Sequence, residues 1–106
     1  MLLADRSGPS RAVLASLLAG TPGVALVGEV DEPGRVEAMI RETSADVVVV
    51  DDRLLPEGGD HWTRMIVVGA DDDPGYAARA ERFGAMAWIP KDHADSLLPA
   101  LLSDAI

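Results

Sequence analysis

The run Val47-Val48-Val49-Val50, followed directly by Asp51, decides the fold of this chain. Four consecutive β-branched residues, with no polar residue among them, are typical of a strand that is buried on both faces, as in the centre of a parallel sheet. A second apolar run, from Met65 to Val68, has the same character. The two runs therefore predict central strands of a parallel sheet that is covered by helices on both faces.

Apolar and helical segments alternate on either side of these two strands. Further strands are expected at residues 2–4, 24–27 and 87–89. Helical spacing of apolar residues and helix start signals predict helices between Ser10 and Gly20, from Pro33 to Ile40, from Asp73 to Phe83 and from Leu97 to Ile106. The alternation predicts one doubly wound α/β domain over residues 1–106.

The connection between the two central strands is unusually short. Leu54 to Arg64 is a stretch of eleven residues that includes Pro56, Gly58 and Gly59. Because a crossover between parallel strands usually needs a dozen or more residues and a helix, the third helix is expected to be missing. Part of one sheet face would then need cover from Trp62, from the second and fourth helices closing in, or from a second chain.

The composition excludes several classes of site and partner. The 106 residues carry a net charge of −9, which repels a phosphate backbone, so the chain itself is not expected to bind nucleic acid. It has no Cys, which excludes disulfides and thiolate metal sites. No apolar run reaches the ~18 residues of a membrane span, and no signal-peptide pattern opens the chain, so a cytoplasmic location is expected.

Charged residues directly follow the predicted strands. Asp5 follows the first strand, Asp51 follows the central one, and Lys91 comes just after the last. Ligands of doubly wound sheets bind at this carboxyl edge. Carboxylate oxygens suit Mg²⁺ and a lysine suits phosphate oxygens, so the three residues predict a site for a hard cation and a phosphoryl group.

At these residues the chain resembles the receiver domains of bacterial two-component response regulators, above all those attached to LuxR-type transcription factors. The resemblance spans nearly the whole chain, and the order and spacing of its segments make it fairly specific. The segments are Leu2-Leu3-Ala4-Asp5, Leu26-Val27-Gly28-Glu29, Asp46 to Asp51, and the stretch that contains Gly84-Ala85, Trp88, Lys91 and Asp92. Together with the alternation of elements, it implies a flavodoxin-like fold with five parallel strands in the order 2-1-3-4-5.

The resemblance assigns the phosphoacceptor aspartate to one of two positions. Reading forward from Asp5 points to Asp51, whereas reading backward from Leu55-Pro56 points to Asp52. We take Asp51 as the expected acceptor and Asp52 as the alternative. Lys91 matches the lysine that contacts the phosphoryl group in this family.

Two positions depart from the family pattern. Arg6 stands where the family has a second acid, so a fixed positive charge replaces a ligand of the Mg²⁺ that Asp5 and Asp51 would hold, or its support. Gly69 stands where the family has the Ser or Thr whose hydroxyl follows the phosphoryl group during switching, whereas Trp88 keeps the aromatic switch position. We therefore expect weak Mg²⁺ binding or none, and Arg6 or Lys91 paired with Asp51.

These features favour a regulatory module, not an enzyme, that acts through protein contacts independently of phosphorylation. A working receiver, phosphorylated on Asp51 with Mg²⁺, is the alternative. A phosphohydrolase with Asp51 as nucleophile ranks lower, because Arg53 stands where that chemistry needs a general acid. The expected partners are a second copy in a homodimer, a sensor kinase or a linked DNA-binding domain. The chain is not expected to bind a membrane.

Overall fold

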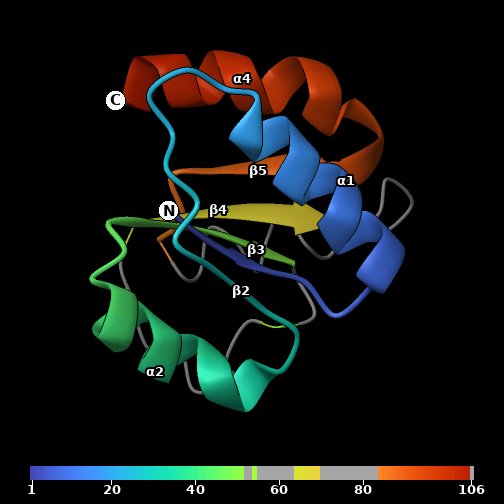
Figure 1. Ribbon diagram of the computed structural model, residues 1–106. Coiled ribbons are helices and arrows are strands. Elements are labelled where there is room, and N and C mark those ends of the chain that lie inside the picture. Colours follow the sequence, from blue (N-terminus) through green and yellow to red (C-terminus); the bar gives the residue numbers. More distant parts are fainter. Residues whose placement is uncertain (52–53, 55–63, 70–83, 106) are drawn as a thin grey trace.

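A parallel sheet lies between two layers of helices in the computed structural model, which describes residues 1–51, 54, 64–69 and 84–105 (Figure 1). The strands are β1 (Leu2–Ala4), β2 (Gly28–Val30), β3 (Val47–Asp51), β4 (Arg64–Gly69) and β5 (Ala87–Pro90). The helices are α1 (Gly8–Ala19), α2 (Pro33–Thr43) and α4 (Ala94–Ala105), and the short 3₁₀ turn η2 (Lys91–His93) directly precedes α4.

The strands lie in the order β2-β1-β3-β4-β5, and every neighbouring pair is parallel. This confirms the predicted order 2-1-3-4-5 and the doubly wound architecture. In the register of the sheet, Ala4 of β1 lies opposite Val50 of β3. The residues that follow, Asp5 and Asp51, therefore reach the same edge of the sheet.

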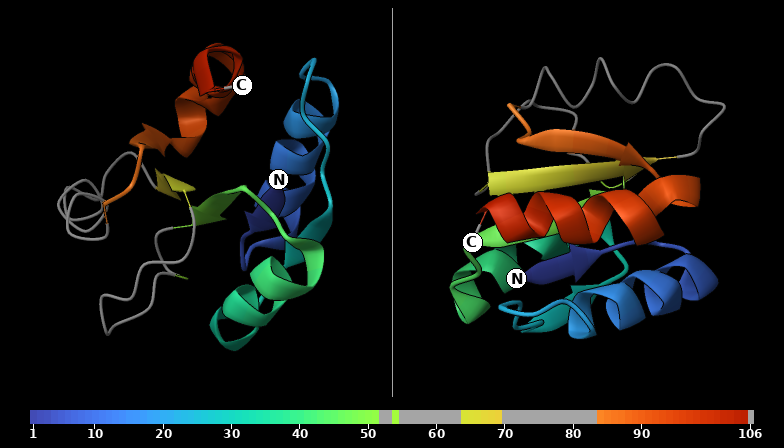
Figure 2. Two further views of the ribbon diagram at one scale, coloured as in Figure 1. Left: turned by 90° about the vertical axis from the view of Figure 1, so that its left-hand side faces the viewer. Right: turned by 90° about the horizontal axis from the view of Figure 1, so that it is seen from above.

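The two faces of the sheet carry separate hydrophobic cores because side chains alternate along each strand. Val48 and Val50 face α2, whereas Val47 and Val49 face the layer formed by α1 and α4. Figure 2 shows α1 and α4 on one face of the sheet and α2 on the other. All four valines are buried, as expected for a central parallel strand.

The second strand lies further along the chain than predicted. The apolar run 24–27 has no regular structure, and β2 is formed by Gly28–Val30, which pairs with Leu2–Ala4. A side chain at Gly28 would approach Met39 and Leu2 to 3.0 and 3.2 Å, so the strand passes close beneath α2 where glycine fits. The preference of valines for strands is overridden here by packing.

The last helix begins earlier than predicted, at Ala94 instead of Leu97, because η2 leads directly into it. Ala94, Leu98 and Leu102 recur at intervals of four residues and are buried against the sheet. The predicted helix from Asp73 to Phe83 lies outside the described residues.

In the short connection after β3, the structure describes Leu54. Residues 55–63, which include Trp62, lie outside the described part of the chain. The prediction that the third helix is missing concerns these residues. Leu54 is buried in the core on the α2 side. On this face Val48, Val50 and Val67 are 0% exposed, and Met65 is 1% exposed. These residues of the sheet face are therefore buried within the chain itself.

Candidate functional site

Three charged side chains meet at the carboxyl edge of the sheet. Asp5 directly follows β1, and its backbone N–H donates to the carbonyl of Val30, which extends the pairing of β1 with β2 by one residue. Asp51 is the last residue of β3, and Lys91 is the first residue after β5. Because parallel strands end at one edge, residues 86 positions apart in the sequence come into contact.

Lys91 bridges the two carboxylates. Its Nζ lies 3.0 Å from Oδ2 of Asp5 and forms a second ion pair with Oδ2 of Asp51. The Asp5 side chain is 0% exposed and that of Asp51 is 6% exposed, whereas a quarter of the Lys91 side chain reaches solvent. One ammonium group thus contacts two buried carboxylates and supplies part of the counter-charge that they require.

Asp5 also holds the first turn of α1. Its Oδ1 accepts a hydrogen bond from the backbone N–H of Ser7 at 3.0 Å, and its Oδ2 accepts one from the hydroxyl of Ser10 at 2.6 Å. Burial acts to raise the pKa of Asp5, but the hydrogen bonds from Ser10, Ser7 and Lys91, with the lysine charge, outweigh it and lower the pKa. The carboxylate therefore stays ionised and joins β1, α1 and the end of β5.

Solved structures with this fold are response regulator receiver domains, several of them from the LuxR family. The signal receiver domain of NarL from Mycobacterium tuberculosis matches with a TM-score of 0.81 and 23% identity, over 98% of this chain and 92% of that one. A LuxR-family response regulator from Aurantimonas sp. matches with a TM-score of 0.73 and 27% identity, over 98% and 79%. The chain has the receiver fold.

RcsB from Salmonella typhimurium shares this receiver fold with a TM-score of 0.82 and 15% identity, and the match covers 98% of this chain and 57% of RcsB. No protein-family model matches the chain, and no curated protein sequence matches it. Over residues 1–51, 54, 64–69 and 84–105, no helix is long and apolar enough to cross a membrane.

The receiver fold brings together three of the residues singled out from the sequence, Asp5, Asp51 and Lys91. Of the two basic residues expected beside Asp51, Lys91 is the one that pairs with it. Arg6 is exposed and forms no ion pair within the described part of the chain. The alternative acceptor, Asp52, lies outside the described residues.

Gly69 and Trp88 lie on the two strands at the far side of the sheet from β2. Gly69 ends β4, is buried, and pairs with Pro90 of the neighbouring strand. Trp88 lies on β5 with 44% of its surface exposed, whereas the next residue, Ile89, is buried beneath α4. The side chain of Trp88 therefore reaches the surface of the molecule.

Three residues of the site were not predicted as part of it. Ser7 caps α1, where its hydroxyl accepts a hydrogen bond from the backbone N–H of Ser10 at 3.3 Å, and both serines also donate to Asp5. Arg11 donates to the backbone carbonyl of Asp5 at 3.0 Å and lies 3.5 Å from Glu29. The spacing of the two serines indicates a helix start. It does not indicate that the backbone N–H of Ser7 and the hydroxyl of Ser10 donate to Asp5, which directly follows β1.

The residues present are a poor fit for Mg²⁺. The carboxylate of Asp5 already accepts from three donors, and that of Asp51 is paired with Lys91. Within the described residues, no group of three or more His, Cys, Asp or Glu side chains gathers at a place that could hold a metal ion. Mg²⁺ prefers an octahedron of oxygens, and here one ammonium group contacts both carboxylates.

Proposed function

We propose that this chain is a receiver-type regulatory module that works independently of phosphorylation, through protein contacts. The observation that carries the proposal is the state of Asp5. Its buried carboxylate accepts hydrogen bonds from Ser7, Ser10 and Lys91. It therefore has a structural role and has little capacity left to bind a cation. A module built in this way keeps one arrangement of its carboxyl edge without a metal or a phosphoryl group.

Two substitutions in the sequence support this reading. Arg6 adds a positive charge that a receiver lacks at this position, and this charge opposes a second cation nearby. Gly69 offers no hydroxyl to a phosphoryl group on Asp51, so the movement that usually reports phosphorylation has no donor. We infer that Mg²⁺ binds weakly and that phosphotransfer, which depends on charge neutralisation and positioning, is slow.

A working receiver phosphorylated on Asp51 is the second candidate. The contact between the Lys91 ammonium and Asp51 favours it, because a lysine at that place could contact phosphoryl oxygens. The isolated receiver domain of RcsB, which has the same fold, was determined in the presence of the phosphomimetic BeF₃⁻. The phosphohydrolase alternative gains no support, and Arg53, on which its rejection rested, lies outside the described residues.

The partners of the module follow from its surface and its neighbours. A DNA-binding response regulator of the LuxR family from Staphylococcus aureus has this fold, so we propose a linked or bound DNA-binding domain and a sensor kinase as partners. We also propose a homodimer, because Val13 on α1 and Leu97 on α4 are 62% and 47% exposed. The proposed module is a single non-enzymatic cytoplasmic domain.

Acetyl phosphate with Mg²⁺ tests the proposal by intact-mass spectrometry. The unmodified chain should gain no phosphoryl group, whereas Arg6→Asp should gain one if the missing acid is the main defect. Asp51→Asn in the Arg6→Asp background is the matched control and should abolish the adduct. Stoichiometric phosphorylation of the unmodified chain would refute phosphorylation independence and support the second candidate.

A further inference from the structure

The first turn of α1 is joined to Asp5 by a closed set of three hydrogen bonds. The backbone N–H of Ser7 donates to Oδ1 of Asp5 at 3.0 Å, and the hydroxyl of Ser10 donates to Oδ2 at 2.6 Å. The hydroxyl of Ser7 accepts from the backbone N–H of Ser10 at 3.3 Å, which links the two serines. Both oxygens of the carboxylate are therefore engaged by the helix that follows Asp5 in the sequence.

Asp5 takes the place of an acid that many helices carry in their own first turn. Ser7 is the N-cap of α1 and Ser10 is the third residue of the helix, a position where Glu or Gln commonly accepts from the backbone N–H of the N-cap. Here Asp5 accepts from that N–H, and the hydroxyl of Ser10 donates to the same carboxylate. The positive end of the helix dipole favours a carboxylate at this place and disfavours a cation.

Two donors share one oxygen of this carboxylate. Oδ2 of Asp5 accepts from Ser10 at 2.6 Å and from the ammonium of Lys91 at 3.0 Å, and the side chain of Asp5 is 0% exposed. A Mg²⁺ ion, which needs an oxygen at about 2.0–2.1 Å, would have to displace one of them. Lys91 also pairs with Asp51, whereas Ser10 is neutral. Ser10 can therefore be removed without taking a counter-charge from the buried carboxylates.

We propose that Ser10 is a positioning residue that keeps Asp5 from binding divalent cations, because its hydroxyl occupies the carboxylate oxygen that Mg²⁺ would need. This inference rests on the proposed function, in which the carboxyl edge works without a metal, and it adds a second cause to the charge of Arg6. Arg6 is exposed and acts through charge, which salt screens, whereas Ser10 acts through a partly buried hydrogen bond. Replacing Arg6 by Asp alone therefore leaves Asp5 partly blocked.

Calorimetric titration of the 106-residue chain with MgCl₂ at pH 7 tests this role. In the Arg6→Asp background, Ser10→Ala should bind Mg²⁺ about tenfold more tightly, because metal binding no longer has to break a hydrogen bond to a charged group. Ser16→Ala, the same substitution at an exposed position of α1, should leave the Kd unchanged. High salt should reduce the gain from Arg6→Asp but not the further gain from Ser10→Ala.

An isosteric pair of variants separates the hydroxyl from the fold. Ser10→Thr keeps the hydroxyl and Ser10→Val lacks it at nearly the same size. In the Arg6→Asp background, only Ser10→Val should gain affinity for Mg²⁺. This comparison decides the matter if Ser10→Ala does not fold.

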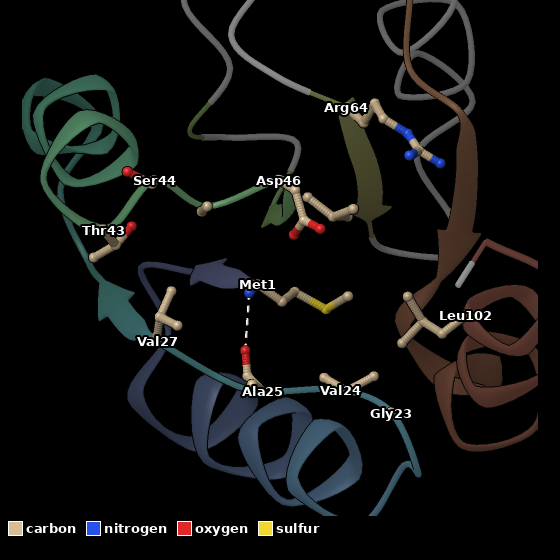
Figure 3. Close-up of a pocket in the computed structure, with 12 residues that line it drawn as sticks. Met1, Gly23, Val24, Ala25, Val27, Thr43, Ser44, Asp46, Arg64 and Leu102 are labelled. Atoms are coloured by element: carbon tan, nitrogen blue, oxygen red, sulfur yellow. Dashed lines mark hydrogen bonds between the residues drawn. The ribbon is translucent and has the colours of Figure 1, made fainter.

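The position of the bound ion must also be shown, because a net charge of −9 attracts cations to the whole surface. Mn²⁺, which also favours carboxylate oxygens, should broaden the amide NMR signals of Asp5 and Asp51 in the Arg6→Asp, Ser10→Ala chain. Asp46 is an internal reference. It lines a cavity at the opposite, amino edge of the sheet, directly before β3, and its signal should be spared (Figure 3).

Three outcomes would overturn the role of Ser10. They are an unchanged Kd in both Ser10→Ala and Ser10→Val, an equal gain in Ser10→Thr, and broadening at Asp46 as strong as at Asp51. Micromolar Mg²⁺ binding by the unmodified chain would instead refute the proposed function itself. The two failures are therefore distinguishable, because the first concerns only the serine variants.

Discussion

Replacing Lys91 by Met removes the ammonium that contacts two buried carboxylates while keeping most of the apolar stem. In the native chain its Nζ lies 3.0 Å from Asp5 and is paired with Asp51 as well. Without it, two carboxylates with at most 6% of their side-chain surface exposed would lose the ammonium group that contacts both of them. We expect the chain to be strongly destabilised at neutral pH.

The size of the effect follows from the burial of the pair. Removing one partner of a buried ion pair costs about 3–5 kcal/mol, because the other charge stays buried and uncompensated. Lys91 is 25% exposed, so water screens part of the interaction and the lower end of the range applies, about 3 kcal/mol. For a domain of this length, that loss lowers Tm by roughly 10–20 °C.

Urea unfolding followed by circular dichroism at pH 7 measures the loss, and the chain offers a matched control. Arg41 and Glu37 form an ion pair at 2.6 Å on the surface of α2, with 75% and 60% of their side chains exposed. Arg41→Met removes the same kind of charge and should cost no more than about 0.5 kcal/mol. Asp51→Asn combined with Lys91→Met should recover part of the stability, because one of the two buried negative charges is then absent.

The same experiment in acid completes the test. Because Lys91 helps to lower the pKa of Asp5, the stability difference between Lys91→Met and the native chain should shrink as Asp5 is protonated. A loss below 1 kcal/mol at pH 7, similar to that of Arg41→Met, would refute the idea that Lys91 holds the carboxyl edge together.

Four further outcomes are expected. Ser10→Ala should cost about 1–2 kcal/mol in urea unfolding, since Asp5 loses the 2.6 Å hydrogen bond that helps to lower its pKa. Because that pKa is lowered in the folded chain, the stabilisation by Asp5 is present above its ordinary pKa of 3.8 and is lost as the pH falls through the pKa of the folded chain. A pH series of unfolding free energies should show a smaller loss in Ser10→Ala. Arg6→Asp should strengthen Mg²⁺ binding by about tenfold or more in calorimetry, and micromolar affinity of the unmodified chain would contradict the assignment. Leu98→Ala, in the core beneath α4, should cost about 3 kcal/mol in the same unfolding assay. Sedimentation equilibrium at low micromolar concentration should give the mass of a dimer, and the mass of one chain throughout would exclude the proposed homodimer.

The doubly wound parallel sheet could be predicted because it rests on strands buried on both faces and on the alternation of strands with helices. The strand order was implied by the resemblance to receiver domains. Val47 to Val50 are buried as expected, and the strand order is the predicted one. The position of β2 could not be predicted, because it depends on the close approach of Met39 to Gly28 across the chain. Local preference favours residues 24–27 as a strand, whereas long-range packing places Gly28–Val30 in the sheet instead.

The carboxyl edge could be predicted in outline but not in its bonding. Asp5, Asp51 and Lys91 were expected to converge, because each follows a strand of a parallel sheet. Which basic residue would pair with Asp51 remained open in the sequence. The answer depends on the direction of two side chains, since Lys91 points into the site whereas Arg6 is exposed.

The central claim is that the carboxyl edge of this receiver fold is held by Lys91 and is not built for Mg²⁺ and a phosphoryl group. Titration with beryllofluoride and Mg²⁺, followed by amide NMR shifts of the native chain and of Arg6→Asp, tests this claim most directly. The account predicts no saturable change around Asp51 in the native chain and a saturable change in Arg6→Asp. A stoichiometric beryllofluoride complex of the native chain, with shifts that spread from Asp51 to Gly69 and Trp88, would contradict it.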